Sequence, residues 1–244
     1  SYFEYLRIPY AHSGVIASMN AMDKSISKII FKNKKILTPK YFILKNMNYR
    51  KNILIESIEK NKLKFPIVVK PTNEGSSIGV HICKNISNLN KKTKMLFKRY
   101  ENLIFENFIG GQEVQVALMN GKAIGAIELK PKRSFYDYKA KYLKSAKTSH
   151  IMPANISKKD SKKVFQISEK AHKSLNCRGV TRCDFKFLRN KFYLLEINTQ
   201  PGMTNLSLVP EIAKYNGISF EKLINNIILD ASINKWAKIL KYLF

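Results

Sequence analysis

Short apolar, β-branched runs alternate with polar turn sequences along most of the chain, and runs of this kind predict β-strands. The predicted strands cover residues 41–44, 65–70, 80–83, 103–108, 113–119, 123–129, 179–187 and 192–197. Asn120-Gly121 separates two of them, and Asn-Gly between alternating apolar runs is a strong signal for a tight hairpin turn. The polar segment Pro71–Gly79 joins another pair of strands in the same way.

Apolar residues three or four positions apart predict helices elsewhere. This spacing occurs at 15–19 and at 24–37, where Thr38-Pro39 ends the helix because the residue before a proline is disfavoured in the helical region. A longer helix is predicted at about 157–176, and further helices are predicted after residue 206. The pattern as a whole favours a protein of mixed helices and hairpin strands.

The 244 residues are 45% hydrophobic, which is enough apolar material for a packed core. At roughly 150 residues per domain, this length predicts one large domain or two small ones. No uninterrupted apolar run approaches the ~18 residues that a membrane-spanning helix needs. Cys83, Cys177 and Cys183 are odd in number and lack metal-ligand spacing, so we expect reduced thiols. These features exclude a disordered chain and a disulfide scaffold, and they predict a soluble cytoplasmic protein that makes no contact with a membrane.

The net charge of +27, from 44 Lys+Arg against 17 Asp+Glu, invites a nucleic-acid interpretation. Only seven of the basic residues are arginine, the side chain that most often reads bases, and the lysines are scattered among many Asn and Ile residues. Runs such as 24–40 and 158–163 are therefore interpreted as solvated faces. We expect no nucleic-acid partner. A basic nucleic-acid-binding protein is the alternative, which a binding assay in near-physiological salt would test.

Two acidic side chains with apolar neighbours, Asp184 and Glu196, stand on successive predicted strands. Because side chains alternate between the two faces of a strand, Arg182 shares the face of Asp184, and Asn198 shares that of Glu196. If the strands pair, the four polar groups meet on one face of a buried sheet. A divalent cation bound by Asp184, Glu196 and Asn198 would offset the cost of burying the carboxylates. The alternative is a cluster in which Arg182 forms salt bridges with them.

A lysine and a polar loop lie at the end of the buried strand 65–70. Lys70, together with the backbone N–H groups of Gly75, Ser76 and Ser77, forms a pattern that can bind phosphates. The chain contains neither GxxxxGK[ST] nor GxGxxG. Strand-loop-strand also differs from the strand-loop-helix of Walker and Rossmann sites, so those nucleotide folds are disfavoured.

Two further segments carry candidate chemistry. Glu106 and Glu113 flank an extended connector that can present backbone groups to a ring while a carboxylate binds sugar hydroxyls. Residues 131–153 are polar and rich in lysine and aromatic side chains, and a connection of this length predicts a functional flap over a site. The aromatic run 135–142 within it is equally compatible with a surface strand.

Taken together, these motifs resemble those of the D-alanine–D-alanine ligase family of ATP-grasp enzymes, from the first residue to about residue 230. The resemblance is carried by Ser13-Gly-Val, Met22-Asp-Lys24, Val-Val-Lys70-Pro, Glu74-Gly-Ser-Ser-Ile-Gly79, Glu106 with Glu113, Tyr136-Asp-Tyr-Lys-Ala-Lys-Tyr142, Arg182-Cys-Asp184, Leu-Leu-Glu196-Ile-Asn-Thr-Gln-Pro-Gly-Met-Thr204 and Ser207-Leu-Val-Pro210. It implies an α+β ATP-grasp fold in which two subdomains sandwich ATP. The implied divisions are 1–20 as the remnant of a substrate domain, 21–106 as the central subdomain, 107–234 as the catalytic subdomain and 235–244 as a tail helix.

The resemblance also implies roles for individual residues. ATP would be bound by Lys24, Lys70, Ser76, Ser77, Glu106, Phe108, Ile109, Glu113 and Lys141. Two Mg²⁺ or Mn²⁺ ions would be bound by Asp184, Glu196 and Asn198. Catalysis would involve Ser76, Tyr142, Arg182 and Gly202, and the carboxylate of the second substrate would lie at Ser207 and Leu208. Tyr142, with Ser76 as its hydrogen-bond partner, would favour D-alanine over D-lactate as the second substrate.

The implied reaction is the ATP-dependent ligation of two D-alanines to D-alanyl-D-alanine through an acyl phosphate, for peptidoglycan synthesis. The family also implies a cytoplasmic enzyme, usually a homodimer. Its members begin with a substrate domain containing a His-Gly-x-x-Gly-Glu-Asp-Gly stretch, and this stretch does not occur here. We therefore expect a fragment of a longer protein. The alternative is a truncated, catalytically inactive remnant that binds ATP.

Overall fold

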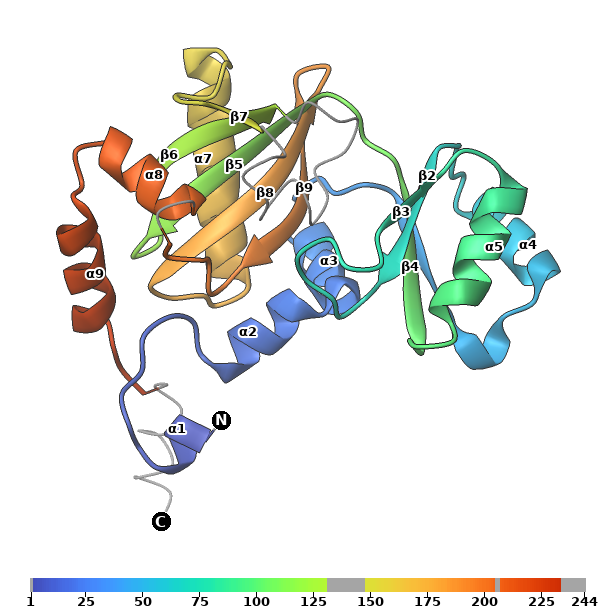
Figure 1. Ribbon diagram of the computed structural model, residues 1–244, viewed down its shortest axis with the longest axis horizontal. Helices are drawn as coiled ribbons and strands as arrows, with labels where there is room; N and C mark the ends of the chain where they lie inside the picture. The colour runs from blue at the N-terminus through green and yellow to red at the C-terminus, as the bar shows by residue number, and fades with distance from the viewer. Residues whose placement is uncertain (1, 131–147, 205–206, 234–244) are drawn as a thin grey trace.

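The computed structural model describes residues 2–130, 148–204 and 207–233. Their strands form two antiparallel sheets, a four-stranded one in the order β1-β4-β2-β3 and a five-stranded one in the order β7-β6-β5-β8-β9. Figure 1 shows the smaller sheet with its helices on the right and the larger sheet on the left, joined by the chain between β4 and β5. The mixture of helices and hairpin strands predicted from the sequence is confirmed.

The smaller sheet has one face covered by helices. Its strands are β1 (Tyr41–Lys45), β4 (Asn102–Asn107), β2 (Ile67–Pro71) and β3 (His81–Cys83), with a short 3-10 helix, η1 (Asn46–Asn48), after β1. Helices α4 (Lys51–Lys60) and α5 (Ile86–Leu96) form a core with it. Alternation along β2 places Ile67 and Val69 in this core, whereas Val68 and Lys70 line a pocket on the opposite face.

The larger sheet is covered by helices on both faces (Figure 1). Its strands are β7 (Ser149–Ile151), β6 (Lys122–Lys130), β5 (Gln112–Met119), β8 (Val180–Leu188) and β9 (Lys191–Asn198). Helix α7 (Lys158–Ser174) packs on one face, and α8 (Leu208–Tyr215) and α9 (Phe220–Leu229) pack on part of the other.

Alternation along β5 and β8 gives the larger sheet one apolar face and one mixed face. Val114 and Val116 of β5 and Phe185 of β8 are fully buried in the core with α7. Their neighbours in sequence, such as Glu113 and Asp184, face the other way and line the pocket. The strand period therefore places polar chemistry on the side of the sheet that α8 and α9 leave partly uncovered.

Two predicted hairpins are confirmed. Asn120 and Gly121 have φ values of 51° and 76°, which suits the tight turn between β5 and β6, because both central residues of a type I′ turn need positive φ. Strands β8 and β9 pair antiparallel, with Asp184 opposite Glu196 and Arg182 opposite Asn198.

The N-terminal segment contributes apolar side chains to the core of the larger sheet. Helices α1 (Tyr2–Tyr5), α2 (Val15–Met22) and α3 (Lys24–Asn33) precede the smaller sheet in sequence. Ala21, Phe31 and Ile36 nevertheless belong to the core of the larger sheet. The apolar side chains of this segment are therefore buried against α7 and the larger sheet, and the predicted divisions of the chain stay predictions.

Part of the segment predicted as a flap, 131–153, forms a strand. Residues 149–151 form β7, which pairs antiparallel with β6 at the edge of the larger sheet. Residues 131–147 and the predicted tail helix 235–244 lie outside the described residues. In the part of the chain that the structure describes, no helix combines the length and the apolar character needed to cross a bilayer.

Candidate active site

A pocket lies between the two sheets and encloses about 840 Å³, including its open mouth. This inter-sheet pocket takes its lining from both sheets. It is lined by Lys24, Pro39, Val68, Lys70, Pro71, Glu74, Ser77, Ile78, Val80, Glu106, Asn107, Phe108, Ile109, Glu113, Asp184, Lys186, Leu195 and Glu196. Five of the 17 acidic residues of this basic chain lie in this lining. Most of the residues predicted to bind ATP are thus brought together, from both sheets and from α3.

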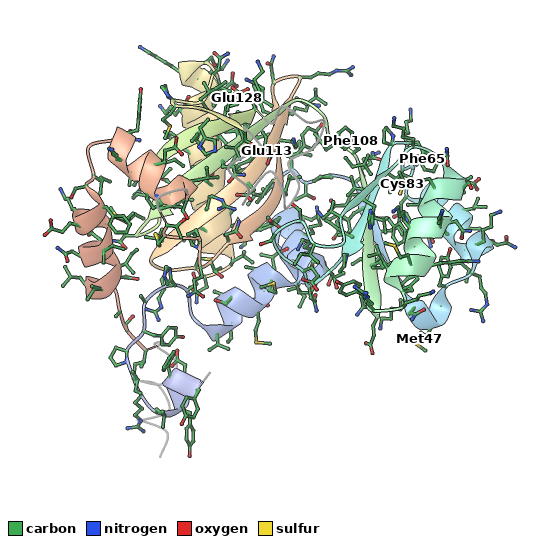
Figure 2. The ribbon with its side chains drawn as sticks, viewed as in Figure 1. Met47, Phe65, Cys83, Phe108, Glu113 and Glu128 are labelled. Carbon is green, nitrogen blue, oxygen red and sulfur yellow. The ribbon has the colours of Figure 1, made fainter. Side chains whose placement is uncertain are left out.

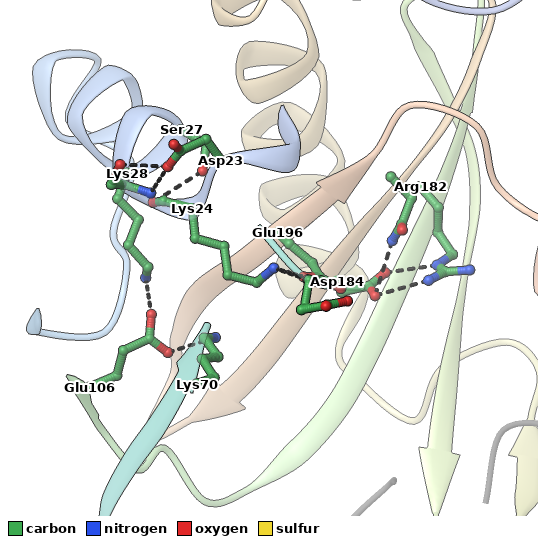
Figure 3. Close-up of polar contacts among 12 residues, drawn as sticks. Asp23, Lys24, Ser27, Lys28, Lys70, Glu106, Arg182, Asp184 and Glu196 are labelled. Atoms are coloured by element: carbon green, nitrogen blue, oxygen red, sulfur yellow. Dashed lines mark hydrogen bonds and ion pairs between the residues drawn. The ribbon is translucent and has the colours of Figure 1, made fainter. Parts of the chain in front are cut away.

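Lys24 lies at the start of α3 and points across the pocket (Figure 3). Helix α3 begins there because the side chain of Asp23 accepts hydrogen bonds from the backbone N–H groups of Ser25 and Ile26. The Lys24 ammonium donates to the Glu74 carbonyl oxygen and lies 3.5 Å from Oε2 of Glu196. The ammonium group of an α3 residue therefore meets a carboxylate of β9 inside the pocket.

Glu106 is buried between two lysines. Its Oε1 lies 2.8 Å from Nζ of Lys28, and its Oε2 lies 2.9 Å from Nζ of Lys70 (Figure 3). Burial by itself raises the pKa of Glu106, but the two ammonium groups outweigh burial and lower the pKa to about 2. Burial lowers the pKa of Lys28, and the facing Glu106 carboxylate opposes that shift. Glu106 is therefore an ionised group that holds Lys70 at the edge of the pocket.

Asp184 and Glu196 are the carboxylates predicted to bind metal, and they lie opposite one another on β8 and β9. Asp184 accepts hydrogen bonds from Nε of Arg182 at 2.7 Å and from the Asn198 amide at 3.3 Å. The four polar groups predicted to meet on one face do so. Within the described residues no three His, Cys, Asp or Glu side chains cluster as a metal site. The predicted set differs from such a cluster because it contains two carboxylates and one amide. Oxygen donors of this kind fit a hard cation such as Mg²⁺.

The connector between the sheets also contributes to the pocket lining. Phe108 and Ile109 follow β4, and Glu113 is the second residue of β5 (Figure 2). Oε2 of Glu113 accepts from Nζ of Lys186 at 2.9 Å, and the two residues lie opposite one another on β5 and β8. An aromatic ring and a paired carboxylate thus line the same pocket, which suits a base and a sugar.

Some predicted residues lie outside the pocket lining. Ser76 stands in the loop between β2 and β3 with a φ of 50°, next to Ser77, which does line the pocket. Gly202 and Ser207 come together in the segment before α8, where a Cβ on Gly202 would lie 2.8 Å from Oγ of Ser207. Leu208 begins α8, and its side chain is buried in the core. Lys141 and Tyr142, both predicted site residues, fall outside the described residues.

The family model for the C-terminus of D-Ala-D-Ala ligase matches residues 30–229. A D-alanine–D-alanine ligase of Pelagibacter ubique is 60% identical over 234 residues, a match that covers 95% of this chain and 75% of that protein. The chain belongs to the D-alanine–D-alanine ligase family. A crystal structure of this ligase from Bacillus anthracis aligns with a TM-score of 0.81 at 32% identity, covering 94% of this chain and 73% of that one. The same enzyme complexed with ATP aligns with a TM-score of 0.81 at 29% identity, covering 94% and 72%.

Membership of the D-alanine–D-alanine ligase family confirms the resemblance found in the sequence, the α+β ATP-grasp fold and the class of enzyme, a ligase. Two charged residues were not predicted: Lys186, which lines the pocket, and Lys28, which lies behind the lining. A signal for each existed in the spacing. Lys28 follows Lys24 by one helical turn, and Lys186 follows Asp184 by two strand residues, so each shares a face with a predicted residue.

Proposed function

We propose that this chain joins two D-alanines to D-alanyl-D-alanine in a reaction driven by the cleavage of ATP to ADP and phosphate, for peptidoglycan synthesis. The observation that carries this proposal is the contact between Lys24 and Glu196 inside the inter-sheet pocket, where Nζ and Oε2 are 3.5 Å apart. A cation suited to ATP phosphates lies directly beside a carboxylate suited to a metal ion, in a chain of this ligase family.

The reaction has two steps. A carboxylate oxygen of the first D-alanine attacks the γ-phosphorus of ATP, the bond from that phosphorus to the bridging oxygen breaks, and ADP leaves. The nitrogen of the second D-alanine then attacks the carbonyl carbon of the acyl phosphate. The bond from that carbon to the phosphate oxygen breaks, phosphate leaves, and the nitrogen loses a proton. Both reactants of the first step are anionic, so the site must neutralise their repulsion.

The cationic side chains of the site can meet this requirement. Lys24 and Lys70 line the pocket and would bind the ATP phosphates. Arg182, beside Asp184, would stabilise the phosphoryl group in transit and the developing oxyanion, together with the backbone of Gly202. Ser76 and Ser77, in the loop between β2 and β3, would bind the same phosphates.

The other end of the pocket would bind the nucleoside, and a neighbouring segment would bind the second amino acid. Phe108 and Ile109 would contact the adenine, and Glu113 would bind the ribose hydroxyls. The hydroxyl of Ser207 and the backbone of Leu208, at the start of α8, would bind the carboxylate of the second D-alanine. Helix α8 directs its N-terminal backbone dipole to that position, which favours an anion there.

Asp184, Glu196 and Asn198 would hold two Mg²⁺ or Mn²⁺ ions. Bound ions of this kind neutralise phosphate charge and orient the transferring group. We propose D-alanine as the substrate at both positions. We also propose that the enzyme acts in the cytoplasm and forms a homodimer.

Phosphate release from Mg·ATP tests the proposal. We expect release by the purified chain to be stimulated by D-alanine but not by L-alanine, with D-alanyl-D-alanine appearing on a chromatogram. The Arg182→Met variant should lose this product, whereas Arg189→Met, at the exposed turn after β8, should retain it. ATP binding without D-alanine-dependent release or dipeptide would contradict ligation and support the ATP-binding remnant instead.

A further inference from the structure

Lys28 is a fully buried lysine, with none of its side chain exposed. An isolated ammonium group in a protein interior is costly, so a buried lysine needs a specific compensating partner. Lys28 lies on α3 one turn after Lys24, on the same face of the helix. Lys24 reaches the pocket directly, whereas Lys28 lies behind the lining and does not contact the cavity.

The partner of Lys28 is Glu106, whose carboxylate also pairs with Lys70. Lys28 takes one oxygen of the Glu106 carboxylate at 2.8 Å, and Lys70 takes the other at 2.9 Å (Figure 3). Glu106 is 3% exposed on its side chain, so water does not substitute for either ammonium group. The ring of Tyr41 lies on a further side of Lys28, with its centroid 5.2 Å from Nζ.

The linked ion pairs Lys28–Glu106–Lys70 also connect a helix that packs on the larger sheet to two strands of the smaller sheet. Helix α3 is anchored to the larger sheet by Phe31, which is fully buried in that core. Glu106 and Lys70 stand on β4 and β2 of the smaller sheet. The ion pair of Lys28 therefore fixes the smaller sheet to α3 directly behind the inter-sheet pocket.

We propose that Lys28 is a positioning residue of the nucleotide pocket, which acts by holding one oxygen of Glu106 so that the other orients the ammonium group of Lys70 toward the bound nucleotide. This inference rests on the proposed function, because it takes ATP as the ligand of the pocket.

The charges explain why a second lysine is needed. With Lys28 in place the three groups carry a net charge of +1, so the carboxylate is compensated and Lys70 keeps attraction for an anion. Without Lys28 the carboxylate and Lys70 form a neutral pair, with both oxygens of Glu106 available to Lys70. Lys70 would then be drawn toward β4 and its attraction for phosphate or for the base would be reduced.

A double-mutant cycle tests this role through equilibrium binding of a non-hydrolysable ATP analogue with Mg²⁺ and without D-alanine. We expect Lys28→Met to weaken analogue binding by about tenfold or more, the scale of a charge-assisted hydrogen bond that is lost or misplaced. In the Glu106→Gln background, the same substitution should change binding by less than about twofold, because a residue that acts through Glu106 has nothing left to position. The matched control is Lys32→Met, an exposed lysine one turn further along α3, which should bind like the unaltered chain.

Thermal unfolding of each variant separates positioning from a general loss of structure. If Lys28→Met does not fold, the decisive comparison is Glu106→Gln against the double variant, which leaves no buried carboxylate without its partner. Equal analogue binding by those two proteins supports the proposal, and a further loss of about tenfold in the double variant contradicts it. A folded Lys28→Met protein that binds the analogue like the unaltered chain also contradicts it. Failure of the unaltered chain to bind the analogue would instead contradict the proposed function itself, whereas analogue binding without ligase activity leaves this test intact.

Discussion

Arg182 binds both oxygens of Asp184, from Nε to Oδ1 at 2.7 Å and from an Nη to Oδ2 at 3.0 Å. The two residues are neighbours on one face of β8, and the amide of Asn198 donates to the same Oδ2 from β9. A bidentate contact of this kind fixes the plane of the carboxylate. The salt bridge and the cation site considered from the sequence therefore use the same carboxylate, and the arginine orients it.

Replacing Asp184 should remove metal-supported catalysis while leaving the fold intact. Asp184→Asn keeps the shape of the side chain but removes its charge, so we expect kcat to fall on the order of a hundredfold or more. Measuring ADP formation against Mg²⁺ concentration should also show a higher Mg²⁺ requirement. Glu221→Gln, on the exposed side of α9, is the control and should leave both values unchanged. An unchanged Mg²⁺ requirement in Asp184→Asn would argue against this residue as a ligand.

Lys186 should matter for ATP binding more than for the chemical step. Its Nζ lies 2.9 Å from Oε2 of Glu113, and the two side chains are only 16% and 12% exposed. Without Lys186 the Glu113 carboxylate loses its fixed orientation, so Lys186→Met should raise KM for ATP about tenfold and change kcat by less than about threefold. Steady-state kinetics with varied ATP measure both quantities. Lys191→Met, at the exposed first residue of β9, should behave like the unaltered chain, and a loss confined to kcat would contradict this role.

Gly111 should be sensitive to substitution, whereas its neighbour Gly110 should not. Gly111 has a φ of +84°, and a Cβ there would lie 2.2 Å from the carbonyl oxygen of Phe187. Gly111→Ala must therefore strain or displace the connector, and we expect its free energy of unfolding to fall by about 1–3 kcal/mol. Gly110→Ala is the matched control, because its added Cβ meets nothing closer than a ring atom of Phe108 at 4.0 Å. Urea unfolding of both variants measures the difference, and equal stabilities would show that the connector adapts freely.

Local and alternating patterns predicted much of this fold. The turn at Asn120-Gly121 depends on the conformational preferences of two adjacent residues, and the structure has it where predicted. The meeting of Asp184 with Glu196 follows from strand alternation once two consecutive strands pair. Helix α4 was not predicted, although Leu54 and Ile58 lie four positions apart and both contribute to the core of the smaller sheet; no side chain caps its start.

Features set by packing between distant segments could not be read from the sequence. Phe31 shows that a helix preceding the smaller sheet is buried in the core of the larger one, which no local pattern indicates. Lys28 shares the polar, lysine-rich character of its surroundings in sequence, and a lysine run normally predicts a solvated face. Its complete burial depends on Glu106, which lies 78 positions further along the chain and 2.8 Å away in space.

Ionisation of Glu106 should make stability depend on pH in the acid range. Lys28 and Lys70 outweigh burial and lower the pKa of this carboxyl from 4.5 to about 2 in the folded chain. A carboxyl with a lower pKa in the folded state stabilises the fold above its unfolded pKa and loses that contribution as the pH falls toward the folded pKa. This group should therefore contribute about 3 kcal/mol that is present at pH ~5 and lost by pH ~2.

Urea titrations across this pH range measure that loss directly. Glu106→Gln has no carboxyl to protonate, so its free energy of unfolding should already be lower near neutral pH and should fall less steeply below pH ~5. Glu56→Gln, an exposed position on α4, should keep the pH dependence of the unaltered chain. If Glu106→Gln and the unaltered chain lost stability equally as the pH fell, the carboxyl could not be the ionised link between Lys28 and Lys70.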